Sequence, residues 1–404
     1  MKYVFISYSK KDSETVKSIN ELLKSHSIPT WIDVEKLLPG QEFDLEIQKA
    51  IGKCKAFLVC LSQSSVNKHG YVQKEIKKAL EELWKIPEGK VFIIPVLLKP
   101  CKVPEALKKF HWVEYFQPDG PASLIKGLQK CFPNTVKKFC KPKPPQGIKL
   151  ISIPGGTFQM GDEKGDLGVR CRPVHSVTVS SFQMSEAEIT NAQYCAYLNA
   201  AKASGDITAT SSTVTGAKGT YSGQNYIYLS DAYDANNRCW ITYSNNVFSV
   251  VPGHENWPVV LVTWYGSKAF AEYYGWDLAR EAEWEYACRG GKQFEYGTGD
   301  GTINKDMANY YNNGPNHPVN VKSYPKNPFG LYDMSGNVWE WCSDWYGSYS
   351  SSPAINPTGA QSGSYRVIRG GGWGGYDGNC RSATRDYLTP DIRYYFIGFR
   401  VVRR

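Results

Sequence analysis

The chain has 404 residues, 42% of them hydrophobic, and a formal net charge of +9. This length is sufficient for two or three domains, each with its own hydrophobic core. The longest apolar runs, such as VFIIPVLL at residues 91–98, are far shorter than the ~20 residues of a membrane span, so no membrane-spanning segment is expected.

The N-terminus and the cysteines indicate a reducing compartment. The opening stretch MKYVFISYSKKD turns polar after one strand length and has no small-residue cleavage site, which argues against a signal peptide. The eleven cysteines are scattered without CxxC pairs, a pattern typical of reduced buried thiols rather than of disulfides or zinc sites. We therefore expect a cytoplasmic protein.

The charge divides the chain into two parts. Residues 1–146 carry 25 lysines, no arginine and 15 acidic residues, a net charge of +10, whereas the remainder carries 22 basic and 23 acidic residues, a net charge of −1. The lysines are spread over predicted helix surfaces and form no basic and aromatic stripe, so no nucleic-acid partner is expected. Between the two parts, residues 133–147 are rich in proline and lysine and predict an extended linker.

Strand-length and helical patterns alternate in the first part. The runs KYVFISY, AFLVCLS and KVFIIPVLL have the length and continuity of strands that are buried on both faces. Three helical patterns lie among them: residues 12–26, a second carrying Ile47, Ala50 and Ile51, and a third carrying Val72, Ile76, Ala79 and Leu83. This alternation predicts a parallel sheet covered by helices, with ligands bound beyond the carboxyl ends of the strands.

The motifs VFISYSKKD, TWIDVEKLLPGQEF, AFLVCLSQSSVNKHGYVQKEIKKAL and FIIPVLL follow in this order. In order and spacing they resemble a TIR domain, over residues 1–132. The resemblance implies an α/β flavodoxin-like fold with a five-stranded parallel sheet. It also implies either cleavage of NAD as substrate, with release of nicotinamide, or self-association of TIR domains as a scaffold.

The same resemblance assigns a candidate NAD site. Its catalytic residue is Glu75, one helical turn after Tyr71, where this chain has Tyr71-Val72 and many relatives have Trp-Cys. Its candidate substrate-binding residues are Ser7, Tyr8, Ser9, Asp33, Phe43 and Tyr71. A carboxylate at Glu75 would stabilise the positively charged ribose as nicotinamide leaves. Without the motif, a helix glutamate among lysines is more often a solvated surface residue.

Aromatic residues, glycines and short turns dominate the second part. The motifs ISIPGGTFQMGD, VTVSSFQMSEAEITNAQY, PVVLVTWYGSKAFAEYYGW, LYDMSGNVWEW and RVIRGGGW keep a fixed order. They resemble a formylglycine-generating-enzyme-like domain over residues 148–404, which implies an α+β fold related to C-type lectins. Two helices are predicted directly from the pattern, over residues 190–200 and 264–274.

The oxidase chemistry of that family needs two reactive cysteines shortly after the glycine-rich step. The stretch GGGWGGYDGNCRSATR holds a single one, Cys380, which stands too late for either position. We therefore expect a binding domain without formylglycine-generating activity.

The family resemblance also implies a structural calcium ion at the YDMSGNVWE step. The implied ligands are side-chain oxygens of Asp333 and Glu340 and the carbonyls of Gly336 and Val338, which are hard-cation ligands. The alternative is a turn in which the two acids accept hydrogen bonds from backbone amides.

The C-terminal window at residues 374–396 has neither a helical nor an alternating period. Some members of the lectin-like family are variable proteins of diversity-generating retroelements, in which rewritten asparagine codons never give Lys, Glu, Gln, Met or Trp. These five types make up 85 of the 404 residues, yet none occurs among the 23 of the window. The candidate ligand-binding residues are Gly374, Gly375, Tyr376, Thr384, Asp386, Tyr387, Leu388, Thr389, Ile392, Tyr394, Tyr395 and Phe396. Trp373 and Arg381 are expected to belong to a fixed support, although an ordinary loop-rich terminus would show the same bias.

Two functions are therefore open. In the first, a diversified lectin-like domain binds a protein or a surface glycan and controls NAD cleavage by the TIR domain. In the second, a TIR scaffold without catalysis is joined to a ligand-binding adaptor.

Overall fold

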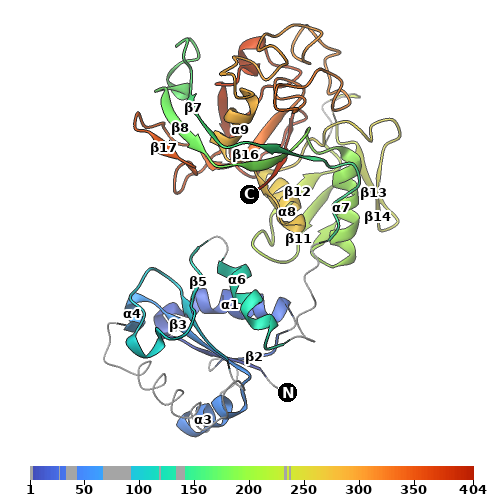
Figure 1. Cartoon of the computed structure of the whole chain (residues 1–404). Helices are drawn as coiled ribbons and strands as arrows, with labels where there is room; N and C mark the ends of the chain where they lie inside the picture. The colour runs from blue at the N-terminus through green and yellow to red at the C-terminus, as the bar shows by residue number, and fades with distance from the viewer. Residues whose placement is uncertain are drawn as a thin grey trace. The chain divides into compact units, whose positions relative to one another are not determined.

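The computed structural model describes residues 3–26, 28–32, 43–66, 92–117, 120–132, 142–231, 234–235 and 238–404. The chain forms two compact units, Met1–Cys140 and Lys141–Arg404 (Figure 1). In the part of the chain so described, no helix has the length and apolar character to cross a membrane.

A five-stranded parallel sheet forms the centre of the first unit. Its strands are β1 (Val4–Ser7), β2 (Thr30–Trp31), β3 (Ala56–Leu61), β4 (Phe92–Leu97) and β5 (Val113–Glu114), in the spatial order β2-β1-β3-β4-β5. This is the flavodoxin-like order, in which the direction of winding reverses between β1 and β3. The predicted TIR fold is confirmed.

Alternate residues of each central strand enter different cores, as continuous apolar strands require. Leu58 and Cys60 of β3 pack with α1 (Ser13–Ser25) and α6 (Gly120–Gln129), whereas Phe57 and Val59 pack with α3 (Phe43–Lys53). Figure 1 shows α3 on the face of the sheet opposite α1 and α6. Three short helices complete the described part of the unit: η1 (Lys10–Asp12), α4 (Gln63–Val66) and η2 (Glu105–Leu107). The third predicted helix falls at residues 67–91, outside the described residues.

The second unit has several small sheets and three longer helices. One sheet joins β15 (Asp277–Leu278), β21 (Val401–Arg403), β9 (Phe182–Ser185) and β6 (Leu150–Ile153), and another joins β19 (Arg385–Leu388), β18 (Arg366–Arg369), β16 (Trp339–Trp345) and β20 (Ile397–Gly398). A third joins β17 (Ala354–Ile355), β8 (His175–Val179) and β7 (Gly156–Met160). Two antiparallel sheets are β10 (Ile207–Ala209) with β11 (Thr213–Gly216) and β12 (Asn225–Tyr228), and β13 (Ile241–Ser244) with β14 (Val247–Val250). This mixed arrangement confirms the predicted lectin-like fold class.

Local sequence sets the ends of the first two long helices. Thr190 caps α7 (Asn191–Ala203) through a capping box with Gln193, and α8 (Trp264–Tyr274) begins after Thr263. Gly275 ends α8 with φ 74°, a left-handed conformation that glycine adopts without strain. The predicted helix over 264–274 has these bounds, and the one over 190–200 extends three residues further.

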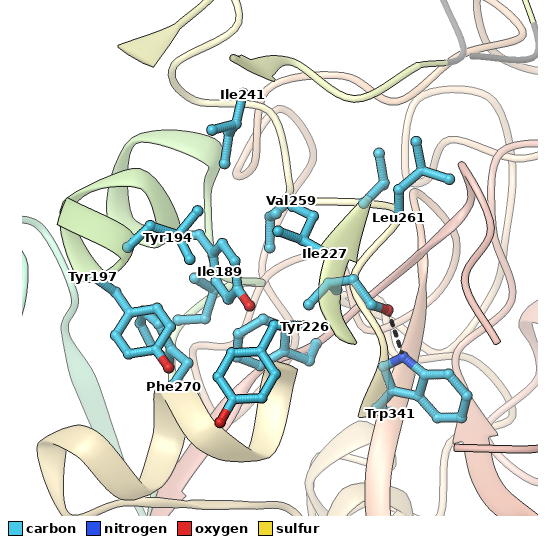
Figure 2. Packing of buried hydrophobic residues seen from close by; sticks show 14 of the residues in the cluster. Ile189, Tyr194, Tyr197, Tyr226, Ile227, Ile241, Val259, Leu261, Phe270 and Trp341 are labelled. Carbon is cyan, nitrogen blue, oxygen red and sulfur yellow. Dashed lines mark hydrogen bonds between the residues drawn. The ribbon is translucent and has the colours of Figure 1, made fainter. Parts of the chain in front are cut away.

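An aromatic core joins these two helices to the sheets. Tyr197 of α7 meets Phe270 of α8 edge to face, with ring centroids 5.3 Å apart (Figure 2). The Trp341 indole of β16 donates to the Val262 carbonyl oxygen at 3.1 Å, which satisfies its only polar group inside the core. The core therefore holds β16, the strand to which the C-terminal window is attached.

Candidate functional site

The described part of the NAD site predicted for the TIR unit lies at the carboxyl end of β1. Ser7 and Tyr8 are buried there, and Ser9 precedes η1. Phe43 begins α3. Asp33, Tyr71 and Glu75 lie outside the described residues, so the predicted catalytic arrangement stays a prediction.

A side-chain hydrogen bond marks the point where the winding of this sheet reverses. The Ser62 hydroxyl, just after β3, donates to Oδ2 of Asp12 at 2.8 Å, and Asp12 follows β1 by five residues. Ligands of doubly wound sheets bind at this edge. Ser7 and Tyr8 lie at this edge of the sheet, and their role in NAD binding stays a prediction.

In the second unit, β16 holds both ends of the C-terminal window. Before the window, β18 pairs antiparallel with β16, and after it β20 pairs parallel with β16. Inside the window, β19 returns along β18, with Arg369 opposite Arg385. The segment between β18 and β19 contains the short helix η4 (Asp377–Cys380).

The glycines that precede the window permit a close backbone approach. Gly371 has φ 72°, and a Cβ atom there would lie 2.8 Å from the Asn379 carbonyl oxygen and from the Cys380 sulfur. Any larger residue would push η4 away from β18. The glycines of the RGGGW motif thus allow η4 to lie close against the backbone that follows β18.

Two adjoining hollows lie over the window. Hollow A has a volume of about 710 Å³ and hollow B about 460 Å³, both within the ~300–1,000 Å³ of ligand pockets. They share Trp339, Asn379 and Asp386 as lining residues, so they form one continuous surface, which we call the window surface.

Nine of the twelve candidate ligand-binding residues line this surface. They are Gly374, Gly375, Tyr376, Thr384, Asp386, Leu388, Tyr394, Tyr395 and Phe396. Of these, Thr384 is 8% exposed, and its hydroxyl donates to the Gly378 carbonyl at 2.6 Å. The other three, Tyr387, Thr389 and Ile392, lie elsewhere. Tyr387 packs against Tyr346 and Tyr365, and the Thr389 carbonyl oxygen accepts a hydrogen bond from the Ile392 amide in a tight turn.

The window surface also includes residues that the sequence pattern did not indicate. Tyr311, Asn312 and Asn316 line hollow A, and Asp166 and Arg170 line hollow B. These residues precede the window by 58 to 208 positions, and no local signal marks them. Trp373, expected in the buried support, instead lines hollow A, is partly exposed, and has an indole N–H without a hydrogen-bond partner in the structure.

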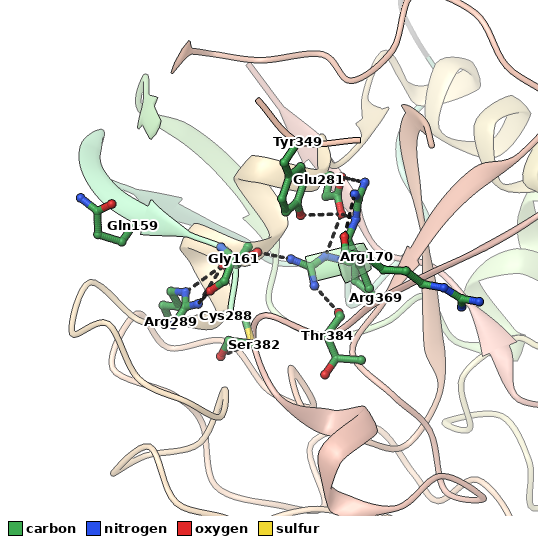
Figure 3. Close-up of polar contacts among 12 residues, drawn as sticks. Gln159, Gly161, Arg170, Glu281, Cys288, Arg289, Tyr349, Arg369, Ser382 and Thr384 are labelled. Atoms are coloured by element: carbon green, nitrogen blue, oxygen red, sulfur yellow. Dashed lines mark hydrogen bonds and ion pairs between the residues drawn. The ribbon is translucent and has the colours of Figure 1, made fainter. Parts of the chain in front are cut away.

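Buried ion pairs contact the backbone of the window (Figure 3). Arg369 is completely buried; it pairs with Glu285 and donates to the Thr384 carbonyl oxygen. Burial alone would lower the pKa of Arg369, but Glu285 raises it well above its ordinary value. Conversely, burial opposes ionisation of Glu285, yet Arg289 and Arg369 lower its pKa. The pairs are therefore charged, and through the Thr384 carbonyl oxygen they hold the backbone of the window.

Cys380 lies in the buried layer rather than in the hollows. It is 0% exposed, and burial, followed by the charge of Asp377, raises the pKa of its thiol far above its ordinary value. The only cysteine among the residues described as lining either hollow is Cys171. Cys171 is also buried, and burial raises the pKa of its thiol. A reactive thiolate pair, which the oxidase chemistry needs, is not formed by these residues.

The implied calcium ligands fit a cation only in part. Both oxygens of Glu340 accept from Arg400 at 2.7 Å, and Oε2 also accepts from the Trp284 indole, so its charge is already compensated. Within the described residues no group of three or more His, Cys, Asp or Glu residues has a metal-binding arrangement. Asp333 nevertheless has a buried Oδ1 without a partner, and so does Glu188 at Oε2.

These two carboxyl groups interact with one another. Burial, together with the charge of Asp333, raises the pKa of Glu188 well above its ordinary value, and burial raises the pKa of Asp333 to about 6. A divalent cation between them would compensate both charges. Asp333 and Glu188, rather than Asp333 and Glu340, are thus the two buried carboxyl groups at this step that form no ion pair with a described cationic side chain.

These features define a lectin-like unit joined to a TIR unit. The family model of the sulfatase-modifying factor enzyme 1-like domain matches residues 136–404, and that of the TIR domain matches residues 4–128. The chain belongs to the sulfatase-modifying factor enzyme 1-like family and carries a TIR domain at its N-terminus.

Particular relatives match the second unit. A formylglycine-generating enzyme of Streptomyces coelicolor is 34% identical over 285 residues, covering 62% of this chain and 87% of the relative. The serine/threonine-protein kinase pkn1 of Chlamydia caviae is 34% identical over 272 residues, covering 66% of this chain, and the chain spans only 40% of that protein's length. Among solved structures, Treponema denticola variable protein 1 is similar, with a TM-score of 0.48 and 23% identity over 64% of this chain and 95% of the other.

Proposed function

We propose that this protein recognises a ligand through the window surface and that ligand binding controls NAD cleavage by the TIR domain in the cytoplasm. The observation that supports ligand recognition is that the residues of the window divide into a surface group and a buried group. Nine of its candidate residues gather on one hollowed surface, while Arg369, Arg381 and Cys380 are buried beneath it. Substitutions of side chains on such a surface usually have little effect on the stability of the fold. Substitutions of the buried residues beneath it are destabilising.

Sequence diversification of the window by a retroelement belongs to the same proposal. The absence of Lys, Glu, Gln, Met and Trp from residues 374–396 supports it, because rewritten asparagine codons cannot produce these types. The neighbourhood of the gene tests it. A nearby reverse transcriptase and a near-copy of the last stretch, with adenines at the codons of the window surface, are expected; their absence would contradict it.

Two further assignments complete the proposal. The TIR domain hydrolyses NAD to nicotinamide and ADP-ribose with Glu75 as catalytic residue, and TIR domains of separate chains associate when ligand is bound. A structural calcium ion held by Asp333 and Glu188 stabilises the lectin-like unit. The free carboxylate oxygens of this pair support the ion, since calcium takes oxygen ligands.

Nicotinamide release from NAD by the purified full chain is the decisive measurement. Release that rises with protein concentration supports an effector that is activated by assembly. If chains brought together by an N-terminal dimerising tag release no nicotinamide, the TIR domain acts as the scaffold of the second hypothesis.

A further inference from the structure

The window surface carries more negative than positive charge. Three aspartates line hollow B: Asp166, Asp377 and Asp386. Its two arginines are both engaged in ion pairs, Arg170 with Asp386 at 3.2 Å and Arg385 with the buried Glu281 at 2.7 Å. Hollow A adds no cationic side chain to the lining, and it adds Asp234.

Asp377 is the acid that lacks a counterion. It is exposed, its Oδ1 accepts from the Gly378 amide at 2.9 Å, and no ion pair of Asp377 occurs with any residue that the structure describes. Asp166 also reaches solvent, with 66% of its side chain exposed, although it pairs with Arg381. A cationic group approaching hollow B therefore meets an exposed carboxylate that is not paired with any described cationic side chain.

An exposed pair of aromatic rings adjoins this acidic position. Tyr376, next to Asp377, is 66% exposed and meets Tyr311 edge to face with centroids 5.0 Å apart. Ring faces attract Lys and Arg side chains, and the attraction grows where water is excluded. Tyr376 and Tyr311 would therefore add to the attraction that Asp377 exerts on a cationic side chain.

The walls of hollow A suit apolar side chains. Tyr394 and Phe396 stack face to face, 5.0 Å apart with an interplanar angle of 8°, so their inner faces are covered by one another. Tyr394 and Phe396 line hollow A together with Leu388 and the Trp373 indole, so the wall there is made of apolar and aromatic groups.

We propose that the window surface binds a protein segment that presents a Lys or Arg side chain next to apolar side chains. The basic group lies in hollow B at Asp377, the acid without a counterion, and the apolar neighbours fill hollow A. The hydroxyl groups of a neutral glycan can donate hydrogen bonds to the carboxylates of hollow B, but they carry no charge to compensate them, whereas a Lys or Arg side chain does both, so a basic protein segment fits the surface better. This inference rests on the proposed recognition role of the second unit and is independent of NAD cleavage.

A phage-displayed library of random peptides, selected on the immobilised full chain, tests the proposal. Selected peptides are expected to be enriched in Lys or Arg flanked by apolar residues, relative to the starting library. For a synthetic peptide of the enriched sequence, Asp377→Asn with Asp386→Asn is expected to weaken binding at least about tenfold, since hydrogen bonds to charged groups are lost. The exposed Asp306, outside both hollows, provides the control Asp306→Asn, which should bind as the parent does.

Each alternative outcome is informative. Enrichment of neutral or acidic peptides, or equal binding by the double Asn variant, would overturn the charge assignment. Selection of no peptide, with binding instead to neutral glycans on an array, would overturn the protein partner. If selected peptides bind equally well to a variant with Tyr376→Ser and Tyr394→Ser, the window surface is not the binding site, and the proposed recognition role fails together with this inference.

Discussion

Arg385 and Glu281, 104 residues apart, form a buried pair with two parallel hydrogen bonds, both 2.7 Å long. Arg385 opens β19, whose next residues reach the window surface, and Glu281 opens α9 (Glu281–Cys288). The pair therefore connects the C-terminal window to a helix of the core. The side chains are only 2% and 4% exposed, so neither charge has water as an alternative partner.

Loss of this pair is expected to destabilise the lectin-like unit. Arg385→Ala leaves Glu281 buried with reduced compensation and should lower the free energy of unfolding by about 3 kcal/mol or more. Arg393→Ala is the matched control, because its pair with Asp231 is about one-third exposed and contributes at most ~1 kcal/mol. Urea unfolding of both variants measures the difference; equal losses would contradict a supporting role for Arg385.

Substitutions on the window surface are expected to change binding and not stability. Tyr376→Ser with Tyr394→Ser should cost about 0.5 kcal/mol per site, because both side chains are at least 40% exposed. Trp284→Ala, at a residue with 0% exposure, should cost about 3–5 kcal/mol. Thermal unfolding compares them. A double tyrosine variant as unstable as Trp284→Ala would place the window in the core.

Glu75→Gln is expected to lower nicotinamide release at least ~100-fold while NAD binding persists, because only an interaction with the transition state is removed. The exposed Glu21 on α1 provides the control Glu21→Gln, which should keep the parent rate. Rates are followed by chromatography of nicotinamide. A Glu75→Gln variant as fast as the parent would remove Glu75 from the mechanism.

The stability of the lectin-like unit is expected to depend on Asp344. Burial, followed by the charge of Glu281, raises the pKa of Asp344 from an ordinary 3.8 to about 7. Between these values the folded state binds the proton and the unfolded state releases it, so the contribution of Asp344 to stability falls as the pH rises from about 4 to about 7.

Asp344→Asn removes this titration, so its melting temperature relative to the parent should rise across the same interval and level off above it. Calorimetry at pH 5 and pH 8 checks the sign. Asp306→Asn, at an exposed acid, should show no such trend. A constant difference between Asp344→Asn and the parent at both pH values would refute the assignment.

Calcium is expected to raise the melting temperature of the full chain in a saturable manner. The rise should be absent in Asp333→Asn and in Glu188→Gln, since each removes one of the two partnerless carboxylate oxygens. If Glu340 rather than Glu188 held the ion, Glu188→Gln would keep the calcium response. Magnesium serves as the comparison ion, because its strict octahedral geometry suits two carboxylates and backbone carbonyls less well.

Short-range sequence was sufficient for much of the fold. Continuous apolar runs predicted the doubly buried strands of the first unit, because such strands need no alternation. Thr190, Gln193 and Thr263 supplied helix caps that act within three or four residues. By contrast, α9 was not predicted, because all eight of its residues, its three glutamates included, are buried, so its polar residues do not mark a solvent-exposed face.

What the sequence by itself determined is therefore local: the order of motifs, the caps, and the absence of five residue types from the window. Only the tertiary structure decided which side chains share a surface. It placed Trp373 in hollow A rather than in the buried support, brought Tyr311 against Tyr376, and left Asp377 without the counterion that Asp386 has. These outcomes depend on contacts between residues far apart in the chain, and the pairing of β16 with β18 and β20 fixes them. No local pattern encodes such contacts, because burial and charge compensation arise only when distant segments pack together.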